Sequence, residues 1–262
     1  MGLAASQFAN TNTNFTNVTF NVTDGYQQIT AVGEVIVTIT GHHNVSDYNG
    51  QEHAVEGYDV AISNPLYTTS DFIFNGNASA SRTNVGTTNM GLSSSQFTNT
   101  STNFTNVTFD VTDGYQQITA VEGVVVTITG HHNVSDYNGQ EHTVEGYDVA
   151  ISNPLYTSSD FTFSGNATAT RTNAGTSDMG LATSQFANTN TNFSNVTFNV
   201  TDGFQTINKI NATVTITGHH NTSVYDGNAH VTEGYDVQTS TNLYSASDFS
   251  FSGDATASRT DD

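Results

Sequence analysis

The sequence predicts an all-β protein made of tandem antiparallel β-sandwich repeats. Three observations predict this fold class: an internal repeat of about 89 residues, a period-two alternation of apolar and polar residues, and a Thr, Asn, Ser and Gly-rich composition with only two Pro in 262 residues. No segment has apolar residues at helical spacing over three turns. We therefore expect short strands joined by turns, grouped into several small domains and not one large core.

The repeat sets the expected domain boundaries. The triplet "TDG" begins at Thr23, Thr112 and Thr201, two steps of 89 residues, whereas "GHH" begins at Gly41, Gly130 and Gly218, steps of 89 and 88. The lost residue lies between "TDG" and "GHH" of the third copy, where the copies also differ most, as is typical of exposed connections. We therefore expect two complete β-sandwich repeats, 31–119 and 120–208. They are flanked by the C-terminal part of a repeat, 1–30, and by the N-terminal part of a repeat, 209–262.

Four segments of each copy alternate as half-buried strands do. In the third copy the outward Ile36 is replaced by Thr213, while the inward positions stay apolar. Asn49-Gly50, Asn138-Gly139 and Asp226-Gly227 are residue pairs typical of type I′ hairpin turns, in which both residues have positive φ. Strands and turns at this spacing predict a sandwich of immunoglobulin-like size. The residues expected to face inward are Val18, Phe20 and Val22; Val35, Val37 and Ile39; Tyr58, Val60 and Ile62; and Phe72 and Phe74.

The charge narrows the range of partners. The chain has four basic residues against 24 acidic ones and a net charge of −20. Because so few of its side chains can neutralise phosphate groups, this charge argues against nucleic acid and anionic membranes as partners. No apolar run is long enough to span a bilayer, so we expect no membrane insertion. A chain without Cys that is rich in Thr and Asn is typical of exported bacterial surface proteins, so we expect an extracellular location. "MGL" at 1–3 recurs at 90–92 and 179–181, and we expect the chain to be an excerpt of a longer array with no secretory leader of its own.

All nine histidines lie in the repeated motif "GHHNVSDYNGQEH". In an extended strand His42 and His43 point to opposite faces, so at most one of them can share a site with His53. The third copy keeps its three histidines but loses the acidic residues that correspond to Asp47 and Glu52. We expect the imidazoles to pack against Tyr48 and to bond the backbone, with metal binding as the alternative.

No enzymatic site is predicted. The chain has no Cys nucleophile, no G-x-S-x-G, no H-E-x-x-H and no Gly-rich phosphate loop, so we expect no catalytic residue and no cofactor. No D-x-D-x-D-G loop is present, and a calcium site between Asp24 and acids of the next module stays an alternative. Arg82, Arg171 and Arg259 occur once per copy and are expected to pair with a carboxylate or to cap carbonyls.

The order of these motifs resembles a known family. Each copy has "YNG" or "YDG" with a following His, then "EGYDV", then "DFxFxGxAxAxRT" and "MGL…VTDG". This order is similar to that of the MBG and YDG-type repeats of large bacterial surface proteins, which are related to bacterial immunoglobulin-like domains. The triplets at Tyr48, Tyr137 and Tyr225 carry the resemblance most specifically. The resemblance implies non-catalytic tandem modules in a stalk or adhesin, and it implies no particular ligand.

We therefore expect a structural array whose partner is itself, as a head-to-tail homopolymer, or the neighbouring repeats of a longer chain. In the polymer, Phe15, Val18, Phe20 and Val22 would supply a strand that completes the open sandwich at 209–262 of another copy and so give filaments. The alternative is an adhesive module that binds a glycan or a host protein through exposed loops or a tyrosine face. The orientation of Tyr67, Tyr156 and Tyr244 distinguishes the two, since buried rings favour the shaft.

Overall fold

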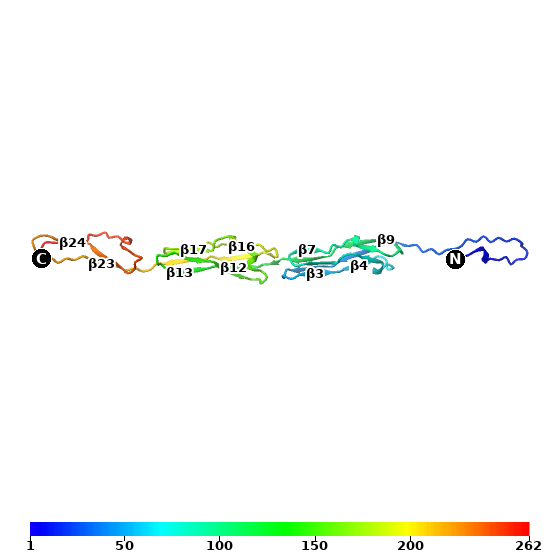
Figure 1. Cartoon of the computed structure of the whole chain (residues 1–262), viewed down its shortest axis with the longest axis horizontal. Helices are drawn as coiled ribbons and strands as arrows, with labels where there is room; N and C mark the ends of the chain where they lie inside the picture. Colours follow the sequence, from blue (N-terminus) through cyan, green and yellow to red (C-terminus); the bar gives the residue numbers. More distant parts are fainter. Residues whose placement is uncertain (262) are drawn as a thin grey trace. The chain divides into compact units, whose positions relative to one another are not determined.

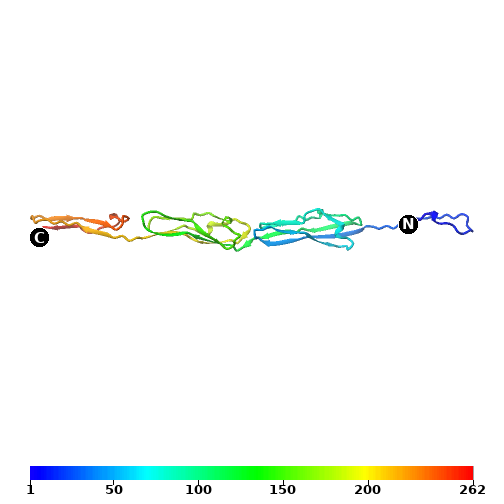
Figure 2. The same ribbon diagram turned by 60° about the horizontal axis from the view of Figure 1, so that its bottom comes forward.

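The structure is a computed structural model that describes residues 1–261, and it is all-β (Figure 1). Among these residues the only helices are 3-10 turns of three residues each, which confirms the predicted fold class at the level of secondary structure. The chain divides into two compact units, Met1–Ala120 and Val121–Asp262. A second view shows the strands of each copy from another side (Figure 2).

The strands recur in the same order in each copy. The first copy contains β1 (Val32–Gly41), β2 (His43–Asp47), β3 (His53–Glu56), β4 (Tyr58–Ile62), β5 (Phe72–Phe74), β6 (Ser79–Arg82), β7 (Gly86–Asn89), β8 (Phe97–Asn99), β9 (Phe104–Thr112) and β10 (Tyr115–Thr119). The second contains β11 (Val121–Glu122), β12 (Val125–Gly130), β13 (His132–Asp136), β14 (His142–Glu145), β15 (Tyr147–Ile151), β16 (Phe161–Phe163), β17 (Thr168–Arg171), β18 (Gly175–Asp178), β19 (Phe186–Asn188), β20 (Phe193–Ser194), β21 (Thr197–Thr201) and β22 (Phe204–Asn208). The third contains β23 (Val214–Gly218), β24 (His230–Glu233), β25 (Tyr235–Thr239) and β26 (Thr256–Arg259). The 3-10 turns are Ala5–Gln7, Thr69–Asp71, Ser94–Gln96, Ser158–Asp160, Thr183–Gln185 and Ala246–Asp248.

The sheets are mixed, which corrects the expectation of a purely antiparallel fold. In the first copy β1 lies between β4, which is antiparallel to it, and β9, which is parallel, and β10 lies between parallel β2 and antiparallel β7. The second copy repeats this order with β12 between β15 and β21 and with β22 between β13 and β18. Parallel neighbours need a long crossover connection, which the residues between β2 and β9 supply. Apolar alternation reports which face a residue occupies and not the direction of its neighbour, so the sequence pattern missed this point.

The parallel pairings of successive sheets keep one register through each complete copy, and together they are called the ladder below. Val32 pairs with Phe104 at one end and Asp47 pairs with Thr119 at the other, and the paired residues are separated by 72 positions throughout. The ladder of the second copy keeps the same separation, from Val121 opposite Phe193 onwards. The chain therefore enters a copy at one end of the ladder and leaves it at the other. At 3.3 Å per residue, 16 residues carry the chain about 50 Å.

The core lies along this ladder. Val35, Val37 and Ile39 have no exposed surface, which confirms the predicted inward face, and they pack with an aromatic cluster. Tyr67 and Phe104 meet edge to face at 5.0 Å, as Tyr156 and Phe193 do in the second copy. Val124, Val126 and Ile128 repeat the buried row of β1. The remaining buried members of the first cluster are Phe72 and Phe97.

The Asn-Gly pairs do not form the predicted type I′ hairpins. Gly50 has φ +79, but among residues 1–261 the only non-glycine with positive φ is Asn195, so Asn49 does not fit that turn. The strands on either side pair elsewhere, β2 with β10 and β3 with β6. The Asn49 Oδ1 accepts a hydrogen bond from the Gln51 amide at 2.9 Å, which turns the chain between two sheets.

Candidate assembly surfaces

The first histidine of each motif has an oxygen acceptor beside each ring nitrogen. In His42, Nδ1 lies 2.7 Å from the Glu56 carbonyl oxygen and Nε2 lies 3.3 Å from Asp59 Oδ1. Because both oxygens are acceptors, the doubly protonated imidazolium fits this place best. His131 and His219 repeat the contacts, at 2.7 and 3.2 Å and at 2.8 and 3.1 Å. The bond to the Glu56 carbonyl and the one to Asp59 raise the pKa of His42, and the aspartate contact is the main cause of the raised pKa of His131 and His219.

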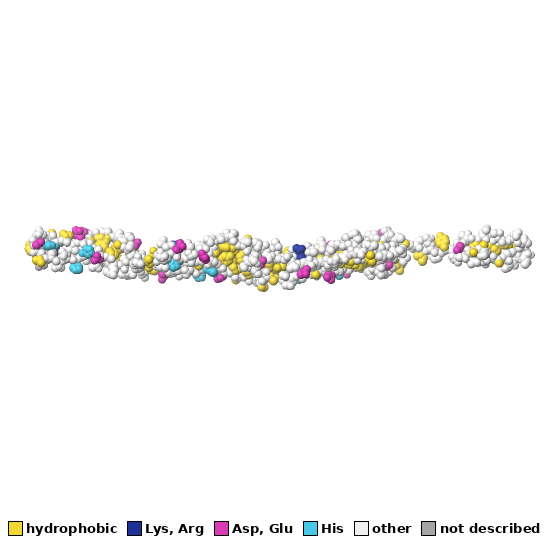
Figure 3. All heavy atoms as spheres, in the orientation of Figure 1, with side chains coloured by type: hydrophobic (Ala, Val, Ile, Leu, Met, Phe, Trp, Pro, Cys, Tyr) yellow, Lys and Arg dark blue, Asp and Glu magenta, His cyan; other side chains and the backbone are white. Residues whose placement is uncertain are grey.

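The other two histidines of the motif face different partners. His43 stacks on Tyr115 with ring centroids 5.3 Å apart, and His53 Nε2 lies 3.0 Å from Asn49 Oδ1. The structure therefore bears out the expected backbone contact for the first histidine and gives the second a ring partner from β10. Over residues 1–261 no group of three His, Asp or Glu side chains is placed to hold a metal ion. Figure 3 shows acidic side chains scattered over the face in view and not gathered at one place.

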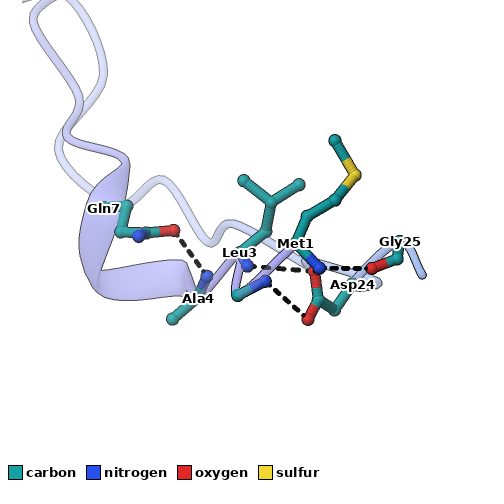
Figure 4. Close-up of polar contacts among 7 residues, drawn as sticks. Met1, Leu3, Ala4, Gln7, Asp24 and Gly25 are labelled. Carbon is teal, nitrogen blue, oxygen red and sulfur yellow. Dashed lines mark hydrogen bonds and ion pairs between the residues drawn. The ribbon is translucent and has the colours of Figure 1, made fainter. Parts of the chain in front are cut away.

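An aspartate of "TDG" clasps the "MGL" segment of the same copy. Asp113 accepts hydrogen bonds from the Gly91 and Leu92 amides at 3.0 and 2.8 Å, and Asp202 makes the same contacts with Gly180 and Leu181. In the N-terminal segment Asp24 accepts from the Gly2 and Leu3 amides at 2.9 and 3.0 Å (Figure 4). These amides lower the pKa of Asp24 because they favour the carboxylate. Asp24, considered above as a calcium ligand, thus already has partners inside its own segment.

Two glycines cross where the strands of the ladder are interrupted. A Cβ on Gly41 would clash with the backbone of Gly114, and one on Gly130 would clash with the backbone of Gly203. Next to this crossing, the fully buried Gln116 accepts a hydrogen bond from Asn44 Nδ2 at 3.1 Å, as Gln205 does from Asn133. Sequence reasoning missed this role, although "GHHN" and "TDGYQ" were visible as repeated strings.

The arginines cap carbonyls, as one of the two predicted alternatives stated. Arg82 donates to the Asn84 and Val85 carbonyl oxygens, both at 2.7 Å, and Arg171 donates to the Ala174 carbonyl oxygen at 3.0 Å. Gly86, with φ +133, lies against the Arg82 guanidinium, where a Cβ would collide with it. Each arginine therefore holds the turn that leads into the next strand.

The predicted assembly residues lie in a segment without a strand. Residues 17–23 were expected to form one, but between Gln7 and Ala31 the structure has none, because a strand needs a paired neighbour. Phe15 is 61% exposed and Val18 43%, whereas Phe104, the counterpart of Phe15, is 5% exposed. Phe20 stacks on Phe8 at 5.8 Å, and Phe20 and Val22 are half-buried. Their role in assembly stays a prediction.

The third copy is open on the side that the ladder covers elsewhere. β23 pairs with β25 alone, and β24 pairs with β26 alone. Ile216 is 49% exposed, whereas the counterparts Ile39 and Ile128 are fully buried. No strand forms at 219–229, where a copy of β2 would lie, since no partner strand is present there.

No protein-family model, curated protein or solved structure matches this chain. Within residues 1–261 no helix has the length and apolar character of a membrane span.

Proposed function

We propose that this chain is a non-catalytic structural array, a stalk or adhesin shaft of a bacterial surface protein, made of immunoglobulin-like β-sandwich modules. The observation that carries the proposal is the parallel ladder of each complete copy. It brings the chain in at one end of the module and out at the other, so that every added copy advances the chain by about 50 Å at 3.3 Å per residue. The length of such an array therefore increases with every copy added.

The ladder also suits the module to bear load. Tension on the chain pulls the Val32 end of β1 one way and the Thr119 end of β10 the other way. The paired segments 32–47 and 104–119 are then pulled past each other along their length. Their hydrogen bonds bear the force together and do not break one after another. The acidic surface, with a net charge of −20, keeps such arrays apart in solution.

A force measurement tests the proposal. The chain has no Cys, so the pair Gly33→Cys and Ala120→Cys provides unique handles for pulling the first complete copy within the whole chain. We expect one unfolding event that releases about 250 Å, since 87 residues extend to about 300 Å and the folded copy spans about 50 Å. A matched pair, Gly33→Cys and Thr102→Cys, places both handles at the same end of the ladder, where pulling peels it one residue pair at a time. Equal unfolding forces in the two geometries would contradict the load-bearing role.

The alternative function, adhesion through a tyrosine face, has weaker support. Tyr67 and Tyr156 are 2% exposed, and their hydroxyls donate to the Asp71 and Asp160 carbonyl oxygens at 3.0 Å. Rings placed in this way have no surface to offer a ligand. Their burial supports the shaft in preference to a tyrosine binding face.

A further inference from the structure

The open side of the third copy lacks the neighbours that the complete copies place there. β1 has β9 beside it, β2 has β10, and β5 has β8. In the described part of this copy, residues 209–261, only the counterparts of β1, β3, β4 and β6 are strands. Phe251 is 54% exposed, although its counterpart Phe74 stacks on Phe97 of β8 at 4.8 Å. The missing neighbours are all equivalents of segments within 8–30.

The N-terminal segment has the complementary deficit. Phe8 is 43% exposed and Ile29 88%, whereas the counterparts Phe97 and Ile118 are 5% and 1% exposed. Burying such side chains favours association because apolar surface leaves water. Both segments thus leave uncovered the residues that the complete copies bury against one another.

The close approach of two glycine backbones is also missing in both segments, although the Met1 side chain lies against Gly25 as the Met90 side chain lies against Gly114. Gly41 and Gly130 lie against Gly114 and Gly203, but a Cβ on Gly218 would have nothing within 4 Å. Gly25 is the counterpart of Gly114 and Gly203 by its place in "TDG". A side chain at Gly218 therefore costs nothing in the separate chain and blocks only a crossing strand.

We propose that the open face of 209–262 binds residues 8–30 of a second copy of this chain in the register of the complete modules. The inference rests on the proposed structural function and names the partner of its open end. In this register Phe20 lies opposite Val214, Val22 opposite Ile216, Tyr26 opposite His220, and Gln27 opposite Asn221. Gly25 crosses Gly218. A head-to-tail join between copies fills the acceptor of one chain with the donor of the next, so the partner is a second copy.

Two local contacts of the equivalent segment in the complete copies are already present in the donor segment. Asn10 Nδ2 donates to the Asn12 and Phe15 carbonyl oxygens at 3.2 and 3.0 Å, which repeats the contacts of Asn99 with Ser101 and Phe104. The Asp24 clasp repeats that of Asp113. A segment that keeps these contacts loses less conformational entropy when it binds.

The charges permit the encounter. Asp24 is the only charged side chain in 1–30, whereas the whole chain has a net charge of −20. Repulsion between copies comes from the rest of the chain and is screened by salt, with a Debye length of about 10 Å at 0.1 M. Assembly should therefore be favoured by added salt.

Paired variants of the full chain test this docking by sedimentation and light scattering at about 0.15 M salt. The wild-type chain is expected to form polymers. The donor variant Phe20→Asp and the acceptor variant Gly218→Val should each stay monomeric, and a 1:1 mixture of them should form dimers and nothing longer, because one donor and one acceptor remain intact. Asn21→Asp is the matched control: the first complete copy has Asp110 at this exposed position, and the variant should polymerise like the wild type.

Three results would overturn the docking: a monomeric wild-type chain, polymers of Phe20→Asp or of Gly218→Val, or a mixture of the two variants that stays monomeric. Hydrogen exchange of β1 and β12 shows that the complete copies remain folded in every variant, because these strands lie outside the substituted segments. The force experiment on the first complete copy does not involve 8–30 or 209–262. Failure of the docking is therefore distinguishable from failure of the structural function.

Discussion

The same isoleucine of the repeat occurs three times in this chain, in two different environments, which allows one substitution to be compared between them. Ile39 and Ile128 are fully buried, and Ile216 is 49% exposed. Ile→Ala in a packed core costs about 2–5 kcal/mol, because apolar burial is lost and a cavity remains. For a half-exposed side chain without a cavity, about half of the 1.5–3 kcal/mol transfer free energy is lost, or about 1 kcal/mol.

We therefore expect Ile39→Ala and Ile128→Ala to lower the unfolding free energy of their copies by about 4 kcal/mol, and Ile216→Ala to lower that of its segment by about 1 kcal/mol. Hydrogen exchange read strand by strand is the assay, since the copies need not unfold together and one melting temperature would mix them. The reading strands are β1, β12 and β23.

An equal loss at all three positions in monomeric chains would refute the reasoning, because it would mean that Ile216 is already covered. In the polymer the cost of Ile216→Ala should rise to that of Ile39→Ala, since Val22 of the next copy would then lie opposite. A cost that stays near 1 kcal/mol in polymer would contradict the register, because burial and not chemistry sets the difference.

Three further predictions concern single contacts. The raised pKa of His131 means that its contacts stabilise the second copy fully below the ordinary value of 6.5 and that this stability is lost as pH rises through the raised pKa, so the unfolding free energy read by hydrogen exchange of β12 should fall as pH rises above that value and His131→Gln should remove this fall. Asp202→Asn should lower the unfolding free energy of the second copy by about 1–3 kcal/mol in a denaturant titration, because Asn has one uncharged acceptor oxygen where the carboxylate has two for the Gly180 and Leu181 amides. In the same titration Asp178→Asn, at an exposed position, should change little. Tyr156→Phe should cost about 1–2 kcal/mol through the lost bonds of its buried hydroxyl, whereas Tyr225→Phe, at a ring 69% exposed, should leave the thermal unfolding curve in place.

The inward faces of the strands could be predicted from the sequence, but strand direction could not. Val35, Val37 and Ile39 are buried as expected, because alternation reports directly on which side of a sheet a residue lies. The parallel partner of β1 is 72 residues away, and no local pattern encodes that distance. The Asn-Gly pairs misled for a related reason: Gly50 has the positive φ the turn chemistry requires, but the strands on either side belong to different sheets.

The opening histidine motif also acquires a different explanation from the one its residue types suggested. The backbone of Gly114 leaves no room for a side chain at Gly41. His42 contacts Asp59 of β4, and Asn44 donates a hydrogen bond to the buried Gln116. The contact of His42 is with a strand 17 residues away, whereas Gly41 and Asn44 meet the string "TDGYQ" about 72 residues away. The docking proposed above requires that this pair of strings match between chains as it does within a copy. Under that proposal, repetition of the sequence and strand exchange between chains have a common physical cause.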